Sequence, residues 1–389
     1  MAYSPKMKVV FLCGSLEPGC DGVGDYTRRL AGEIIRQGHQ ATIVALYDKY
    51  LNETYEGRQE DEGISISVLR ITANLSTNKC IQRAKIWIED SDPMWISLQF
   101  VPFAFHPKGL PFKLSSQLRN IWKGRLWHVM FHELWVGMEV TASTKLVWWG
   151  RLQRYMIKSL VADLKPCVIH TQTQLYQTQL ARLGFHAAYL PLFGNIPVVN
   201  STNLMTDKKK EVKNYENKLV FVLFGAIHPG VPVKQLAEEV SQYSKKHKSK
   251  LILQLAGRNG AEQERWMAAW KNTGLEVEML GEQSPEKISE IFQNASLGIS
   301  TTPLALLEKS GSVAAMREHG LSVLCVRQTW KAKGISNLTP LSGILTYHVG
   351  NLEECLSNLS RITVNTSLQA TGTKFVDDLI TAKNRITST

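Results

Sequence analysis

The chain has 389 residues, of which 44% are hydrophobic and 20% are charged, proportions typical of a soluble globular protein. Its length favours two domains of about 150–200 residues each, and no apolar run reaches the roughly 18 residues that span a bilayer. The N-terminus lacks a secretory leader and the six scattered cysteines lack metal-ligand spacing, so we expect a cytoplasmic protein with reduced thiols.

The net charge of +11 is unevenly distributed along the sequence. Residues 100–198 contain 11 Lys and Arg but only 3 Asp and Glu, a local net charge of +8, together with five tryptophans. Such a basic, aromatic-rich segment suits an anionic membrane surface, an anionic substrate or nucleic acid. A solvated basic face around a tryptophan-rich core explains the same composition.

A βαβ unit is predicted near the N-terminus. The apolar run at 8–14 is typical of a buried parallel strand, a glycine-bearing loop follows at 15–24, and 25–37 has the periodicity of a helix. Residues 41–46 form the next predicted strand, whereas the polar, acidic residues 52–66 predict a loop. Since the glycines lack the GxGxxG spacing of dinucleotide-binding folds, the first loop indicates only a ligand near the end of its strand.

Further strands are predicted at 95–100 and 127–131, with a helix at 114–122 between them. The second strand ends at His132 and Glu133, and the carboxyl ends of parallel strands face the crevice in which α/β proteins bind ligands. A His-Glu pair there offers a hydrogen-bond donor and a carboxylate. A satisfied structural pair fits the sequence equally well.

The first half ends with a long amphipathic helix at 145–164 and short strands at 168–170 and 189–192. Residues 195–218 are polar and lysine-rich, which is typical of a domain linker. The pattern of strands and helices then restarts with an apolar run that ends at Gly225. Strands at about 20–30-residue spacing with helices between them predict a second parallel sheet.

The last strand of this second pattern leads into a loop and a short helix that opens with Ser310, Gly311 and Ser312. Backbone N–H groups at the positive end of a helix, with hydroxyls and a glycine beside them, suit a phosphate group. An ordinary strand-to-helix turn with serine at the N-cap is the alternative.

Five segments occur in a distinctive order: the loop EPGCDGVGDYTRRLA, a strand ending in histidine, FGAIHPG, LGEQSPEKISEIFQNASLGIS and a motif ending HGLSV. In this order and spacing, over about residues 8–370, the sequence resembles the GT-B glycosyltransferases. More narrowly, it resembles the retaining, metal-independent family 4 enzymes that use nucleotide-sugar donors.

The resemblance implies an α/β GT-B fold, in which two Rossmann-like parallel-sheet domains face each other across a cleft. The expected parts are an acceptor-side domain at 1–198, a linker at 199–217, a donor domain at 218–372 and a C-terminal helix at 373–389 that crosses back to the first domain. The implied reaction moves a sugar, with retention and with no metal or other cofactor, from a UDP-, GDP- or dTDP-sugar to a glycan, lipid or small-molecule acceptor. We expect no nucleic-acid partner, and a location in the cytoplasm or peripherally at the inner face of the membrane.

Site residues follow from the same resemblance. Catalytic roles fall to His132, Asp25 and Glu308. The expected donor-binding residues are Gly22, Gly24, Gly225, Lys234, Arg258, Gly281, Ser310, Gly311 and Ser312. The expected acceptor residues are Tyr26, Gln99, His106, Lys108 and Glu133.

Two positions depart from the family pattern. The arginine that usually follows the glycine of the second-domain strand is Ala226, so Lys234 or Arg258 is expected to supply the cation for the phosphates. The second glutamate of the family's pair, which binds the donor ribose, falls near Ala314 and Ala315 and leaves the identity of the donor open. The alternatives are a catalytically inactive GT-B-like binding or scaffold protein, or a GT-B epimerase or phosphorylase.

Overall fold

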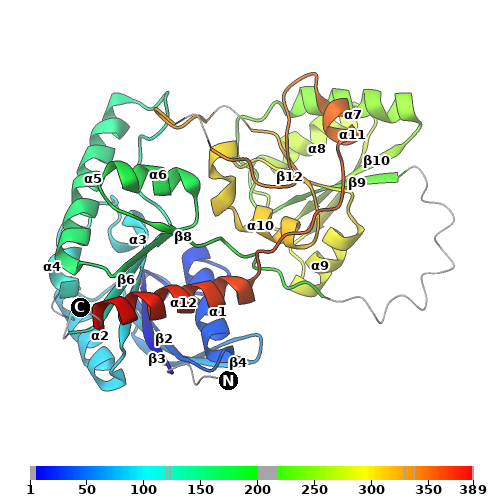
Figure 1. Ribbon diagram of the computed structural model, residues 1–389. Coiled ribbons are helices and arrows are strands. Elements are labelled where there is room, and N and C mark those ends of the chain that lie inside the picture. The colour runs from blue at the N-terminus through cyan, green and yellow to red at the C-terminus, as the bar shows by residue number, and fades with distance from the viewer. Residues whose placement is uncertain are drawn as a thin grey trace. The chain divides into compact units, whose positions relative to one another are not determined.

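The computed structural model describes residues 6–119, 121, 124–199, 218–327, 330–335 and 338–387. The linker expected at 199–217 lies outside these ranges, except for Val199. The chain forms two compact units, which Figure 1 colours from blue at the N-terminus to red at the C-terminus. Unit 1 comprises the residues up to Pro191, Ala332–Gly334 and the segment from Leu368 onward, and unit 2 comprises Leu192–Lys331 and Ile335–Ser367.

Unit 1 is built on an eight-stranded sheet with the strand order β3-β4-β2-β1-β5-β6-β7-β8. Every neighbouring pair is parallel except β3 and β4, which run antiparallel. The strands are β1 (Lys8–Cys13), β2 (Gln40–Asp48), β3 (Tyr55–Asp61), β4 (Ile64–Thr72), β5 (Trp95–Phe100), β6 (Leu126–Phe131), β7 (Val168–Thr171) and β8 (Ala188–Tyr189). The central strands β1, β5 and β6 are almost entirely buried, as continuous apolar runs require when both faces of a parallel sheet are covered.

The hairpin of β3 and β4 corrects the loop predicted at 52–66. Strand β3 lies at the edge of the sheet, where its polar residues alternate between exposed and partly buried positions. Charged and polar side chains are usual on an edge strand because they discourage pairing with another chain. The acidic composition is therefore compatible with a strand at this position.

The helices of unit 1 include one that comes from the far end of the sequence. They are α1 (Gly22–Arg36), α2 (Thr77–Ser91), α3 (Pro102–Phe105), α4 (Leu114–Arg119), α5 (Thr144–Leu164), α6 (Gln174–Arg182) and α12 (Leu368–Thr387). Helix α12, red in Figure 1, lies beside α1, and Phe375 stacks on Phe11 of β1 with ring centroids 5.7 Å apart. The helix begins at Leu368 rather than at 373 and is part of the first unit's core.

Unit 2 is built on a six-stranded, fully parallel sheet with the order β11-β10-β9-β12-β13-β14. In sequence terms this is the order 3-2-1-4-5-6 of the dinucleotide-binding fold. The strands are β9 (Lys218–Phe224), β10 (Lys250–Ala256), β11 (Glu276–Gly281), β12 (Leu297–Ser300), β13 (Val323–Cys325) and β14 (Ile344–Thr346). The helices are α7 (Val233–His247), α8 (Gln263–Asn272), α9 (Pro285–Asn294), the 3-10 helix η4 (Leu304–Lys309), α10 (Gly311–Glu318) and α11 (Leu352–Ser357).

Apolar residues cover both faces of the second sheet. Trp266 and Trp270 are fully buried and stack 5.9 Å apart in one cluster, and Phe292 lies in the other. Ile196 packs in the same cluster as Phe292, which is why residues 192–198 belong to unit 2 although they were expected in the first domain. The prediction of two α/β units, each with a parallel sheet, is confirmed.

Candidate active site

Both sheets have a point at which the strand order reverses. In unit 1 it lies between β1 and β5, and in unit 2 between β9 and β12. Ligands of open α/β sheets bind outside the carboxyl ends of the strands at such points. Functional side chains are therefore expected in the loops after these four strands.

The loop after β1 ends in a capped helix. Asp21 is the N-cap of α1, and its Oδ1 accepts hydrogen bonds from the backbone N–H groups of Val23 and Gly24 at 2.9 and 3.0 Å. A Cβ added to Gly24 would stand 2.7 Å from the carbonyl oxygen of Ser15, whereas one added to Gly22 would meet nothing within 4 Å. Gly24 thus lets the helix pack against its own loop, and Gly22 borders open space.

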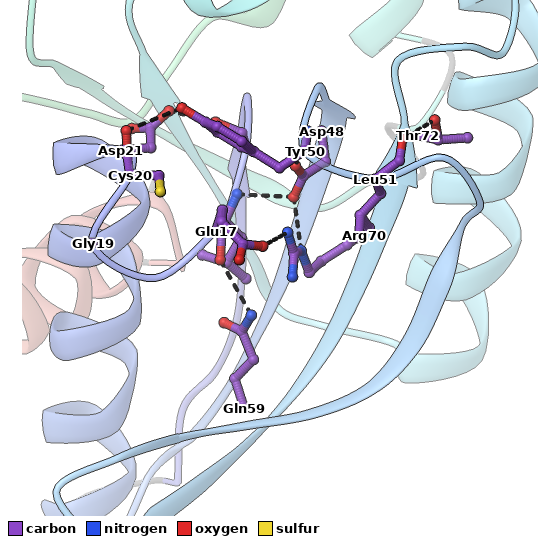
Figure 2. Close-up of polar contacts among 12 residues, drawn as sticks. Glu17, Gly19, Cys20, Asp21, Asp48, Tyr50, Leu51, Gln59, Arg70 and Thr72 are labelled. Carbon is purple, nitrogen blue, oxygen red and sulfur yellow. Dashed lines mark hydrogen bonds and ion pairs between the residues drawn. The ribbon is translucent and has the colours of Figure 1, made fainter.

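This loop is braced from the side by β2 and β4, as Figure 2 shows. The carboxylate of Asp48, which is fully buried, accepts from the backbone N–H of Leu16 at 3.1 Å and from Nε of Arg70 at 2.7 Å. Arg70 also donates to Glu17, and the hydroxyl of Tyr50 donates to a backbone carbonyl of the loop at 3.1 Å. The loop is consequently fixed before any ligand arrives.

Asp25, a predicted catalytic residue, is engaged in the same structure. Its Oδ1 accepts from the backbone N–H of Gly19 at 3.1 Å and forms an ion pair with Arg28. Arg28 is buried, with 8% of its surface exposed. These contacts join the start of α1 to the loop and give Asp25 a structural part there.

Two of the predicted residues, Gln99 and Tyr26, contact His132, which follows β6 and is 4% exposed. Its Nε2 lies 2.8 Å from Oε1 of Gln99 on β5, and its Nδ1 lies 3.1 Å from Oε1 of Gln172. The ring of Tyr26 on α1 meets it edge-on, with centroids 4.8 Å apart. Burial raises the pKa of Tyr26 well above its ordinary value, so its hydroxyl stays protonated.

The other predicted acceptor residues lie in the segments after β5 and β6. Nδ1 of His106 accepts from the backbone N–H of Lys108 at 3.1 Å, and the carbonyl of Lys108 accepts from Nε1 of Trp149 at 2.9 Å. These contacts fix the turn after α3 against α5. Glu133 is half-buried directly after His132.

A cavity of about 470 Å³ opens where the chain leaves β2, β4 and β5. Its lining combines aromatic, hydroxyl, amide and basic side chains, among them Tyr47, Thr77, Asn78, Phe105, His106 and Lys113. Aromatic rings beside hydroxyl and amide groups, without a carboxylate, suit a ligand that carries both apolar and hydroxyl-bearing parts.

In unit 2, the serine cluster forms the start of α10. Ser310 is the N-cap, and its hydroxyl lies 3.1 Å from that of Ser312 and accepts from the backbone N–H of Val313 at 3.4 Å. Gly225, at the end of β9 with φ +81°, is so close that an added Cβ would stand 3.9 Å from Cβ of Ser312. A Cβ added to Gly311 would meet nothing within 4 Å, so the helix start borders open space.

The predicted cations Lys234 and Arg258 are exposed side chains near the carboxyl ends of β9 and β10. Lys234 lies in the first turn of α7. Arg258 pairs with Glu282 at 2.9 Å, and both side chains are well exposed. Since the carboxylate offsets the positive charge of Arg258, that residue is a weaker candidate for a phosphate contact than the sequence indicates.

Two other cations, Arg327 and Lys309, lie near the reversal point of unit 2. They were not among the residues predicted from the sequence. The pKa of His228 in the loop after β9 is lowered, first by burial and then by the charges of Arg327 and Lys309. The backbone N–H of His228 donates to Oγ1 of Thr301, directly after β12, at 2.9 Å. Nε of Arg327 is buried and has no hydrogen-bond partner among the described residues. A lone arginine just after the apolar run of β13 was the available signal.

The positions of the two family glutamates differ in character. Glu308 is half-buried in η4, immediately before the serine cluster. Ala315, near the second position, is fully buried, and a Cβ on Gly194 would stand 2.7 Å from its Cα. Glu318, one turn later, instead accepts the backbone N–H of Gly194 at 2.8 Å. Ala315 therefore lies in a buried contact with Gly194.

Gly281 ends β11 at the far edge of the sheet, with φ +62° and open space around it. Its carbonyl accepts the backbone N–H of Gly257 at 2.6 Å. In the part of the chain that the structure describes, no group of three or more His, Cys, Asp or Glu side chains is placed to hold a metal ion.

No family model and no curated protein matches the chain. Solved structures do. HepE from Anabaena, in complex with UDP and glucose, matches over 98% of both chains with a TM-score of 0.54 and 15% identity. The catalytic domain of starch synthase IV from Arabidopsis thaliana, bound to ADP and acarbose, matches over 97% of this chain and 99% of that one, with a TM-score of 0.56 and 11% identity.

The UDP-GlcNAc 2-epimerase from Neisseria meningitidis, bound to UDP-GlcNAc, matches over 96% of this chain and 100% of that one, with a TM-score of 0.54 and 10% identity. At these identities the likeness concerns the fold. The two parallel-sheet units and these structural neighbours establish that the chain has the GT-B fold of glycosyltransferases.

Proposed function

We propose that the chain transfers a glycosyl group from a nucleotide-diphosphate sugar to an acceptor hydroxyl. The observation that carries this proposal is the start of α10, where Ser310, Gly311 and Ser312 lie beside Gly225 at the reversal point of a parallel sheet. HepE, which has the same fold, binds UDP-glucose, and this favours UDP among the candidate nucleotides.

In this reaction, the bond between the anomeric carbon and the diphosphate oxygen breaks, and its electron pair leaves with the diphosphate. The acceptor oxygen binds the anomeric carbon, and its proton passes to the departing diphosphate. The N–H groups of α10, with the charges of Lys309 and Arg327, would stabilise the leaving diphosphate. The family resemblance supports retention, metal independence and a contact of His132 with the donor sugar.

We place the acceptor in the 470 Å³ cavity of unit 1, because it opens at the carboxyl edge of the sheet and contains His106. Its aromatic rings provide faces for a sugar or a lipid tail, and Thr77 and Asn78 provide hydrogen bonds. Lys113 adds a positive charge at the same cavity. The lining therefore suits a hydroxyl-bearing acceptor that has an apolar or an anionic part.

A membrane contact is proposed for the exposed face of α5. Trp148 and Tyr155 are 60% and 70% exposed, and Leu152 lies between them on the same side of the helix. The guanidinium of Arg151 lies 4.7 Å from the ring of Trp148, and Lys158 is exposed one turn further on. Aromatic and basic side chains on one helix face suit the surface of an anionic bilayer. In the described ranges, no helix combines the length and hydrophobicity that a membrane span requires.

Epimerisation of a nucleotide sugar is the second candidate, because a UDP-GlcNAc 2-epimerase is among the structural neighbours. Both activities need the nucleotide site and differ in whether an acceptor is consumed. A binding protein without catalysis is the third, and the buried Ala315 in place of a ribose-binding glutamate favours it.

The deciding experiment begins with calorimetric titration of the protein with UDP, GDP, ADP and dTDP, each with EDTA and with Mg²⁺. We expect one nucleotide to bind with micromolar affinity in EDTA, and Ser312→Ala to weaken that binding while Ser249→Ala does not. Incubation with the matching nucleotide sugars then separates transfer from epimerisation by product analysis. Failure of all four nucleotides to bind would overturn the proposal.

A further inference from the structure

A continuous chain of buried hydrogen bonds runs through unit 1 from the surface of α12 to His132. It connects helix α12 with the strands β7, β6 and β5, and its members are Asp378, His170, His128, Ser97, Gln99 and His132. In that order, the five donor–acceptor distances are 2.9, 3.0, 2.7, 2.8 and 2.8 Å. Ser97, Gln99, His128 and His170 are fully buried, so water does not compete for these bonds.

Which partner donates in each of these hydrogen bonds follows from Asp378 at the outer end of the series. Partial burial alone would raise the pKa of Asp378, but hydrogen bonds from His170 and Lys374 hold it below its ordinary value. The group is therefore ionised at neutral pH and can only accept hydrogen bonds. His170 must donate to it from Nε2.

The two buried rings transmit this direction. Burial lowers the pKa of His128 well below its ordinary value, and burial also lowers that of His170 despite the opposing effect of Asp378. Each ring is thus neutral near pH 7 and carries one N–H. Since His170 uses its proton at Nε2, its Nδ1 accepts from Nε2–H of His128, and Nδ1 of His128 then accepts the hydroxyl proton of Ser97.

The inner end of the chain fixes the candidate catalytic ring. The oxygen of Ser97 accepts from the amide nitrogen of Gln99, which turns the amide oxygen of Gln99 toward His132. Nε2 of His132 must then carry a proton and donate it to that oxygen. Nδ1 of His132 faces the amide of Gln172, whose oxygen and nitrogen exchange places by a half-turn of the amide.

We propose that Asp378, His170, His128 and Ser97 are positioning residues that hold Gln99 in one orientation and His132 in the Nε2–H tautomer. This inference rests on the proposed role of His132 in glycosyl transfer. Apolar side chains would fill the same core without the cost of burying two imidazoles, and Phe375 already packs against His128 at 5.0 Å. A buried series of hydrogen bonds at this position can determine which ring nitrogen of His132 carries the proton.

The first test is spectroscopic and needs no activity. Long-range ¹H–¹⁵N correlation spectra of the full chain with ¹⁵N-labelled histidine report the tautomer of each ring, and single His→Gln variants assign the signals. We expect His128, His170 and His132 each to carry a proton on Nε2. A wild-type His128 protonated only at Nδ1 would overturn the proposal, even if the protein proves to have no transferase activity.

The second test changes the outer end of the chain. An amide donates as well as accepts, so Asp378→Asn removes the constraint on direction, and we expect two tautomers of His170 and His128. Asp377→Asn is the matched control, because it makes the same charge change at an exposed neighbouring position. We expect kcat to fall several-fold in Asp378→Asn at unchanged KM for the sugar nucleotide, and neither to change in Asp377→Asn.

A double-mutant cycle separates this role from simple packing. Ser97→Ala interrupts the chain, so adding Asp378→Asn to it should lower kcat no further. The inference would be contradicted if the losses of kcat in the two single variants multiplied in the double variant. It would also be contradicted if Asp378→Asn kept a single tautomer and the wild-type kcat. If the wild-type protein shows no transfer activity, the proposed function is refuted, but the tautomer measurement still tests the positioning role.

Discussion

The ring of Tyr26 stands edge-on to the ring of His132, with centroids 4.8 Å apart and planes at 77°. Tyr26 comes from α1 and His132 from the end of β6, so the contact joins the glycine-bearing loop region to the other side of the reversal point in unit 1. The amides of Gln99 and Gln172 face the two nitrogens of the same ring. His132 is therefore held in one orientation by three neighbours.

The first prediction concerns this ring. His132→Ala is expected to lower kcat by about 100-fold or more, because a contact with the donor sugar is lost from the transition state, while the circular dichroism spectrum stays unchanged. Steady-state kinetics measure it, and His186→Ala, an exposed histidine of the same unit, is the control. Normal turnover in His132→Ala would remove this residue from the mechanism.

The second prediction asks which cation binds the diphosphate. Arg327→Gln is expected to weaken nucleotide binding by about 2–3 kcal/mol, since a charge-assisted bond is lost, while Lys234→Ala and Arg258→Gln cost less than about 1 kcal/mol. Calorimetry of the three variants at one ionic strength decides between them, with Arg265→Gln on α8 as control. If Lys234→Ala weakens nucleotide binding the most, the assignment of Lys234 from the sequence is right and the assignment of Arg327 is wrong.

The third prediction compares two glycines of one helix turn. Gly24→Ala should destabilise the fold by about 1–3 kcal/mol, because the new methyl group meets the carbonyl of Ser15 at 2.7 Å. Gly22→Ala meets open space and should leave stability unchanged or raise it by about 0.4–1 kcal/mol. Urea unfolding of both proteins measures the difference. Equal stabilities would show that the helix moves away from its loop at little cost.

The fourth prediction is a pH dependence of stability. Because the pKa values of His128 and His170 are lowered in the folded chain, the unfolded chain binds more protons just below pH 6.5. The free energy of unfolding should therefore fall as the pH drops from about 7 to 5, by up to about 1.4 kcal/mol per pH unit for each ring. Urea unfolding at several pH values should give a shallower slope for His170→Gln. An unchanged slope would mean that His170 is protonated in the folded protein.

The fifth prediction tests the membrane face of α5. Sedimentation with vesicles of phosphatidylcholine and phosphatidylglycerol should carry the wild-type protein down, and high salt should weaken the association. Trp148→Ser and Arg151→Gln should each reduce the bound fraction several-fold, whereas Lys246→Gln in unit 2 should not. Binding that is equal for all three variants would assign the exposed aromatic residues another role.

The buried central strands of both sheets were predictable because each is a short apolar run that ends at a glycine or a polar residue. The strand predicted at 95–100 has those bounds in the structure. Strand β3 was not predictable, because YEGRQED has no apolar face and owes its strand conformation to backbone pairing with β4. Periodicity reports burial of side chains, and an edge strand buries few.

The candidate site was predictable where its residues are close together in the sequence. Ser310, Gly311 and Ser312 announce a helix start by their types and spacing, and the structure places them beside Gly225. Arg327 follows β13 and comes near His228 only through the order of the strands. Partners that are far apart in the sequence leave no periodic signal, so only the folded chain reveals them.

Helix α12 follows all of unit 2 in the sequence, yet it supplies Phe375 to the core of unit 1 and Asp378 to its buried histidines. During synthesis, domains usually fold in order from the N-terminus. Here the core of unit 1 lacks Phe375 until all of unit 2 has been synthesised. The core of unit 1 is thus completed last, and the imidazoles of His128 and His170 acquire their contacts with Phe375 and Asp378 only at that step.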